Sequence, residues 1–260
     1  MSNLKKRTGS KLWKFRNYGL LAVLRHFTFF LICRPNKNSK TETVTSLKDV
    51  CDFFKIDKPT LVWLDQMVNT YLMVAEAKFK DSRIEVKKGA VGENASKNRL
   101  FGIGLAIVTF LPDAFIETGT QNGISAQFAM EISKALNIKI RIVSFDVQEN
   151  SKLIPGAKFE RIILKAPVRK NLSNNLEELG KNHQRIVFFH DSDHSYENMY
   201  TEFTKAKKYL NPVAFLSDDI ELNESLIDFS KANKLTYFQF NLDNKNSVGI
   251  AVKKSDPDGT

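Results

Sequence analysis

The fold is decided by residues 114–125, which read Ala-Phe-Ile-Glu-Thr-Gly-Thr-Gln-Asn-Gly-Ile-Ser. The apolar run Ala114–Ile116 predicts a buried strand, and the polar segment Glu117–Gly123 predicts a turn that leads into a helix. Glycine lets a turn approach a ligand closely, because it has no side chain and tolerates positive φ. The stretch is therefore typical of a strand-turn-helix unit that binds a nucleotide-like ligand.

Strand and helix patterns alternate from Asp113 onward, which is typical of a parallel sheet with crossover helices. The sequence predicts a doubly wound, seven-stranded, Rossmann-like α/β sheet with a terminal antiparallel hairpin, preceded by N-terminal helices. The expected strands are 114–117, 139–145, 161–165, 185–190 and 213–217, with 235–241 and 247–253 as the hairpin. The expected crossover helices are 124–136, 172–180, 196–210 and 221–232.

Acidic residues follow two of the expected strands. The sequence Asp191-Ser192-Asp193-His194 comes after the apolar run 186–189, and Asp218-Asp219 comes after 213–216. Open α/β sheets bind ligands at the carboxyl ends of their strands, so both acidic groups are expected at one sheet edge. The alternative is that these are unrelated, solvent-exposed acids. Three carboxylates close together would repel one another without a cation, which favours a metal site.

The chain before residue 112 is expected to be helical. We divide the sequence into a basic amphipathic arm and linker at 1–45, a helical cap segment at 46–111 and a cofactor-binding domain at 112–260. Packing helices are expected at 47–56, 59–80 and 98–111. Gly102 and Gly104 do not indicate a dinucleotide turn, because no strand precedes them; close helix packing is the better explanation.

Positive charge is concentrated in the arm. The net charge is +10, and residues 1–40 hold ten of the 39 Lys and Arg residues and no acid, which leaves 29 basic against 29 acidic residues in 41–260. The arm's apolar stretch 18–33 is interrupted by Arg25 and His26 and is shorter than the roughly 20 residues that span a bilayer. Three interpretations stay open: packing on the protein's own body, peripheral contact with an anionic membrane through 1–40, and the less favoured contact with nucleic acid. Only two cysteines, Cys33 and Cys51, are present, which favours a reducing compartment, so a cytoplasmic protein is expected, with or without membrane attachment. A homo-oligomer is also open.

The residues of the glycine turn resemble the class I S-adenosylmethionine-dependent methyltransferases, and in particular the divalent-metal-dependent O-methyltransferases. The resemblance extends from about residue 94 to 253 and rests on the order Glu-x-Gly-x-x-x-Gly-x-Ser of the caffeoyl-CoA and catechol branch. It implies that the turn and the following helix end hold the cofactor's methionine carboxylate. It also implies that an acid at the end of the second strand accepts hydrogen bonds from the ribose. The implied cofactor residues are Glu117, Thr118, Gly119, Gly123, Ser125 and Asp146.

The same resemblance gives roles to the acidic groups. It implies that Asp191, Asp218 and Asp219 bind a divalent cation, expected to be Mg²⁺, and oxygen ligands suit that ion. Asp193 is open between a supporting position and a helix N-cap. The implied general base is His194, since macrocin-type sugar O-methyltransferases have histidine where the catechol branch has lysine.

The resemblance therefore implies a Mg-dependent O-methyltransferase for a hydroxyl of a small polyhydroxylated acceptor, a sugar or natural-product moiety. Two other functions stay open. Asp191-Ser192-Asp193 also fits the Asp-x-Asp element of metal-dependent glycosyltransferases, although the Glu117–Ser125 turn argues against it. A non-catalytic module that binds membrane or nucleic acid through 1–40 would not need the acids and His194.

Overall fold

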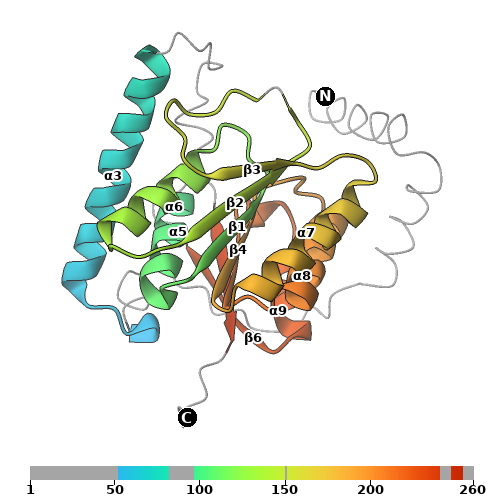
Figure 1. Cartoon of the computed structure of the whole chain (residues 1–260). Helices are drawn as coiled ribbons and strands as arrows, with labels where there is room; N and C mark the ends of the chain where they lie inside the picture. Colours follow the sequence, from blue (N-terminus) through green and yellow to red (C-terminus); the bar gives the residue numbers. More distant parts are fainter. Residues whose placement is uncertain (1–51, 82–96, 150, 241–246, 254–260) are drawn as a thin grey trace, which may run out of the picture. The chain divides into compact units, whose positions relative to one another are not determined.

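The structure is a computed structural model that describes residues 52–81, 97–149, 151–240 and 247–253 (Figure 1). These residues belong to one compact unit, 41–260. The predicted arm and linker lie outside the described residues, as do residues 47–51 of the predicted helix 47–56; of its described residues, 52–54 are helical and 55–56 are not. The division of the chain at 46 and 112 stays a prediction. Among the described helices, none is both long and apolar enough to cross a membrane.

A seven-stranded sheet forms the centre of the fold, in the order β3-β2-β1-β4-β5-β7-β6. Strands β1 to β5 pair in parallel, and β7 runs antiparallel between β5 and β6. The predicted α/β sheet with a terminal hairpin is confirmed. The strands are β1 (Ala114–Thr118), β2 (Arg141–Asp146), β3 (Glu160–Ile163), β4 (Ile186–His190), β5 (Ala214–Ser217), β6 (Leu235–Phe240) and β7 (Val248–Lys253).

Helices cover both faces of the sheet, and each face has its own core (Figure 1). Side chains of a strand alternate between faces, so Phe115 packs with one set of helices while Ile116 packs with the other. Both faces are apolar because both are covered. One layer holds α3 (Lys58–Asp81), α5 (Lys97–Phe110) and α6 (Ile124–Ala135), and the other holds α7 (Val168–Asn182), α8 (Tyr196–Tyr209) and α9 (Ser225–Ala232).

The glycines of α5 are packing residues, as predicted. A Cβ on Gly102 would lie 2.9 Å from Cγ1 of Val248, and a Cβ on Gly104 would lie 2.4 Å from Cδ1 of Leu64. These close approaches seat α5 between α3 and strand β7 of the sheet. This packing also fixes the position of the N-terminal turn of α5, which contributes a residue to the site.

The predicted helix 221–232 is wrong at its start. A short 3₁₀ helix, η1 (Ile220–Leu222), is followed by extended Asn223, and α9 begins at Ser225. The side-chain oxygen of Asn223 accepts a hydrogen bond from the amide of Ser225 at 2.9 Å. Asparagine bonds to nearby backbone in this way and so competes with helix continuation. Because the helix is interrupted at Asn223, the side-chain amide of this residue takes part in the site.

Candidate active site

The site lies where β4 and β5 end side by side. His190 and Ser217 are paired in register, so Asp191 and Asp218 leave the sheet next to each other. The amide of Asp218 donates to the carbonyl of His190 at 3.3 Å. Asp219 has φ +51°, a left-handed conformation that aspartate tolerates better than most residues, and it begins η1. The structure thus brings the three predicted metal ligands, Asp191, Asp218 and Asp219, to one sheet edge.

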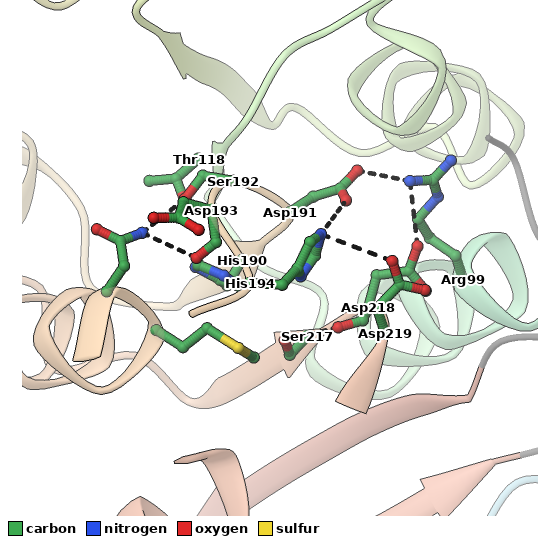
Figure 2. Close-up of polar contacts among 12 residues, drawn as sticks. Arg99, Thr118, His190, Asp191, Ser192, Asp193, His194, Ser217, Asp218 and Asp219 are labelled. Atoms are coloured by element: carbon green, nitrogen blue, oxygen red, sulfur yellow. Dashed lines mark hydrogen bonds and ion pairs between the residues drawn. The ribbon is translucent and has the colours of Figure 1, made fainter. Parts of the chain in front are cut away.

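A buried arginine, which is not among the predicted site residues, links two of these acids. Arg99, in the first turn of α5, lies with Nη1 2.5 Å from Oδ2 of Asp191 and 3.2 Å from Oδ2 of Asp218 (Figure 2). The side chains of Arg99 and Asp218 are each only 5% exposed. Charges this well buried are costly unless they are paired, so the guanidinium and the carboxylates depend on one another.

His194 faces the same carboxylates from the side opposite Arg99 (Figure 2). Its Nε2 lies 3.7 Å from Oδ1 of Asp191 and 3.7 Å from Oδ2 of Asp219. Asn223 holds this loop by donating from Nδ2 to the carbonyl of His194 at 2.8 Å. Burial and the neighbouring His190 lower the pKa of His194, whereas Asp218 and Asp193 oppose the change. A neutral imidazole therefore stands at the acidic cluster, able to accept a proton.

The carboxylates carry more negative charge than Arg99 offsets. Burial raises the pKa of Asp191 to about 7, with Arg99 lowering it and Asp218 adding to the rise. Burial and Asp218 raise the pKa of Asp219 to about 6. Both shifts have one physical cause: three acids share a poorly solvated space with a single guanidinium.

The donor chemistry of this cluster fits a hard divalent cation. Mg²⁺ prefers carboxylate oxygens, and Oδ1 of Asp218 is buried without a hydrogen-bond partner. In the described ranges, however, no three His, Cys, Asp or Glu side chains are already gathered so that they could hold a metal ion. The carboxylates are arranged around the guanidinium of Arg99, and binding a metal ion would require them to be shared with it.

The glycine turn after β1 contacts the β4 loop directly. The amide of Asp191 donates to the carbonyl of Thr118 at 2.8 Å. A Cβ on Gly119, which has φ +97°, would lie 2.0 Å from the carbonyl oxygen of Asp191. Gly119 is therefore required for contact between two loops of the protein, in addition to any approach to a cofactor. Gly123 has φ +71°, and a Cβ there would lie 2.3 Å from the ring of Phe159.

The other predicted cofactor residues of the turn have buried side chains. Glu117 accepts a 2.5 Å hydrogen bond from Ser144 and also interacts with Ser125. Burial raises the pKa of Glu117 to about 8, against the hydrogen bond of Ser144. Thr118 donates to Glu202 at 2.5 Å, on the α8 side of the sheet. Glu117, Thr118 and Ser125 thus shape the turn through protein contacts, and their predicted contacts with the cofactor stay predictions.

Asp146 joins the end of β2 to the same turn. Its Oδ2 accepts a hydrogen bond from the amide of Gln121 at 3.0 Å, and its Oδ1 accepts from Val147 and Gln148 at 2.7 and 2.9 Å. The predicted contact with a ribose would have to use the remaining acceptor capacity of this carboxylate. Its position at the carboxyl edge beside the glycine turn agrees with the predicted site.

A buried carboxylate, that of Glu202, supports the loop after β4 through hydrogen bonds. Glu202 of α8 lies with Oε2 2.8 Å from Nδ1 of His190, and its Oε1 accepts from Ser192 and Asn198 at 3.0 and 3.1 Å. Burial alone would raise the pKa of Glu202, but His190 and the hydrogen bonds to the carboxylate lower it. Asp193 accepts from the amide of Ser195 at 3.2 Å, a local turn just before α8, whose N-cap residue is Ser195. Glu202 and Asp193 therefore hold the loop that carries Asp191 and His194.

Two residues of this arrangement were missed, although the sequence holds a signal for both. Arg99 lies on the same helical face as Ile103 and Ala106, and Glu202 on that of Met199 and Ala206; all four apolar residues are buried. A charged residue within an apolar helical stripe indicates a buried partner. The identity of that partner could not be read from the sequence, because it depends on how distant elements meet.

The sheet order, the glycine turn at β1 and the acids after β4 and β5 define a class I S-adenosylmethionine-dependent methyltransferase. A family model described as Rhamnosyl O-methyltransferase/CmcI matches residues 98–224, the segment from Arg99's helix to η1. This match confirms the resemblance to the S-adenosylmethionine-dependent O-methyltransferases and the enzyme class. The match favours the methyltransferase over the glycosyltransferase alternative.

Several solved structures match this chain at low sequence identity. The methyltransferase PaMTH1 of Podospora anserina is 13% identical with a TM-score of 0.46, over 73% of this chain and 88% of that one. The O-methyltransferase of Bacillus cereus in complex with SAH is 14% identical with a TM-score of 0.42, over 79% and 96%. TomG of Streptomyces achromogenes, an O-methyltransferase of tomaymycin synthesis, is 13% identical with a TM-score of 0.46, over 71% and 90%. No curated protein matches the sequence.

Proposed function

We propose that this protein transfers the methyl group of S-adenosylmethionine to a hydroxyl of a small polyhydroxylated acceptor, a sugar or natural-product moiety, with His194 as the general base. The observation that carries the proposal is the contact of the Gly119 turn with the Asp191 loop. This contact fixes the turn that would hold the cofactor beside the loop that holds His194. The description of the matched family supports a sugar hydroxyl as the acceptor.

Separate groups of residues are proposed to bind the cofactor and the acceptor. The amides at the start of α6 suit the methionine carboxylate, because an anion is stabilised at a helix N-terminus. Asp146 is proposed to accept a hydrogen bond from the ribose. Asp191, Asp218 and Asp219 would hold the divalent cation that the resemblance implies, and such an ion lowers the pKa of a bound hydroxyl.

The chemical step is a displacement at the methyl carbon. The acceptor O–H proton moves to Nε2 of His194, which faces the carboxylates. The oxygen electron pair forms the new O–C bond while the S–C bond breaks toward sulfur, and S-adenosylhomocysteine is released. Positioning of the two substrates is expected to supply most of the rate gain.

Calorimetric titration with S-adenosylmethionine and S-adenosylhomocysteine, with and without Mg²⁺, tests the proposal. Micromolar affinity is expected for both, followed by methyl transfer when hydroxylated acceptors are screened. Folded protein that binds neither compound would show that the cofactor assignment is wrong. Activity that is unchanged after complete removal of divalent ions would remove the metal from the mechanism and leave the cofactor assignment in place.

A further inference from the structure

Arg99 stands where the predicted cation would be expected to act. The three acids come from the ends of β4 and β5, and the guanidinium reaches them from α5, more than ninety residues earlier in the chain (Figure 2). It contacts one oxygen of Asp191 and one of Asp218, the two acids that are adjacent across the parallel strands. The guanidinium therefore does what a cation does in such a cluster: it holds two repelling carboxylates together.

The formal charges leave room for a second cation. When all three acids are ionised, Asp191, Asp218 and Asp219 bring three negative charges and Arg99 brings one positive charge, so two negative charges stay uncompensated. One divalent ion would offset them. An oxygen ligand for this ion is already present, because Oδ1 of the buried Asp218 has no hydrogen-bond partner.

We propose that Arg99 is a built-in cation of this carboxylate cluster, which holds Asp191 and Asp218 in place without a metal ion and competes with a divalent ion for their oxygens. The inference rests on the proposed function, because it concerns the same carboxylates. Arg99 acts through the acids and is a positioning residue. Loss of its charge leaves the carboxylates mutually repelling, and it removes a positive charge that opposes an incoming metal ion.

Mn²⁺ titration of the full chain tests this competition, with free Mn²⁺ followed by electron paramagnetic resonance. Like charges at close range repel, and Arg99→Gln removes the positive charge nearest to these carboxylates, so the variant is expected to bind Mn²⁺ at least about tenfold more tightly than the wild type. Metal-free Arg99→Gln should melt below the wild type, and Mn²⁺ should raise its melting temperature further than that of the wild type. Adding Asp218→Asn to this variant should abolish the tight site.

The matched control is Arg141→Gln, which removes an exposed arginine paired with Glu160 at the far ends of β2 and β3. Its Mn²⁺ affinity should equal that of the wild type. If Arg99→Gln does not fold, Arg99→Lys keeps a charge on a differently shaped head group, and a smaller gain in affinity is expected. Tighter binding in the Arg99 variant supports the proposal whether or not the wild type binds Mn²⁺ measurably.

Equal or weaker Mn²⁺ binding by the folded Arg99 variant would overturn the proposal, and so would the absence of binding in both proteins. S-adenosylhomocysteine binding, measured by calorimetry on the same preparations, reports separately on the proposed function. A wild type without that affinity would overturn the methyltransferase assignment and leave the Mn²⁺ comparison valid.

Discussion

At the residue scale, Gly119 has no side chain, and this lets the turn after β1 contact the loop after β4. Gly119→Ala would place a Cβ 2.0 Å from the backbone oxygen of Asp191, and backbone cannot move aside as a flexible side chain can. We expect a loss of about 3 kcal/mol or more in the free energy of unfolding, together with loss of S-adenosylhomocysteine binding. Urea denaturation and calorimetry measure the two effects.

Gly156→Ala is the control, because Gly156 also has a positive φ, +78°, but no atom lies within 4 Å of an added Cβ. Backbone strain alone should cost about 1–2 kcal/mol there. Equal losses for the two variants would mean that the contact between Gly119 and Asp191 has no energetic weight.

His194 is tested by separating turnover from cofactor affinity. His194→Ala removes the proposed base and should lower kcat by a factor of about 10²–10⁴, while the affinity for S-adenosylhomocysteine changes little. His183→Ala is the control, because His183 follows α7 and lies 3.9 Å from Asp113, away from the acidic cluster. Near-normal turnover of His194→Ala would return this histidine to a purely structural role.

Glu202 makes the free energy of unfolding depend on pH in a predictable direction. Its pKa lies below the usual 4.5, so the stability that the ionised carboxylate contributes is present above pH 4.5 and is lost as the pH falls through the folded-state pKa. Glu202→Gln should cost about 2 kcal/mol at neutral pH, since charged hydrogen bonds are lost. Urea denaturation across the acid range should show this difference shrinking below pH 4.5. A difference that grows there would contradict the assigned direction.

At the scale of elements, Gly180 lies where α7 meets α8, and helix propensity alone predicts the wrong sign for the effect of Gly180→Ala on stability. Gly180 lies inside α7, and in an isolated helix alanine would be better by about 1 kcal/mol. A Cβ there would lie 2.0 Å from the backbone oxygen of Tyr209, so Gly180→Ala is expected to destabilise the protein by at least about 1 kcal/mol net. The exposed neighbour Lys181 is the control, and Lys181→Ala should stay within about 0.5 kcal/mol. Thermal denaturation that shows Gly180→Ala to be stabilising would disprove the contact.

The order and kind of the elements were predictable because strands buried on both faces and amphipathic helices leave strong periodic patterns. The bounds of β1, β4 and α8 agree with the prediction to within one residue. The break at Asn223 was not predicted, although its cause is local: the asparagine side chain accepts a hydrogen bond from the amide two residues later. For the site, the residues at strand ends could be identified from topology, whereas the partners of Arg99 and Glu202 could not, because they lie 92 and 12 residues away.

At the scale of the whole molecule, charge separates the arm from the rest. Residues 1–40 carry ten basic residues and no acid. If the arm contacts an anionic surface, the full chain should sediment with vesicles containing anionic lipid at low salt, and should dissociate as ionic strength rises. A variant with all ten basic residues of 1–40 changed to Gln should remain in the supernatant. Equal sedimentation of both proteins would place the membrane contact elsewhere or exclude it.

The hydrogen bond from Asp191 to Thr118 joins the turn proposed to hold the cofactor to the loop proposed to hold a cation. If occupation of the turn by cofactor shifts the β4 loop, it also shifts the affinity of the carboxylates for a cation. Linkage then requires reciprocity: whatever factor separates cofactor affinity with and without the ion must also separate ion affinity with and without the cofactor. Saturation of the enzyme by one ligand would then depend on the cellular concentration of the other, in the direction set by the sign of this coupling.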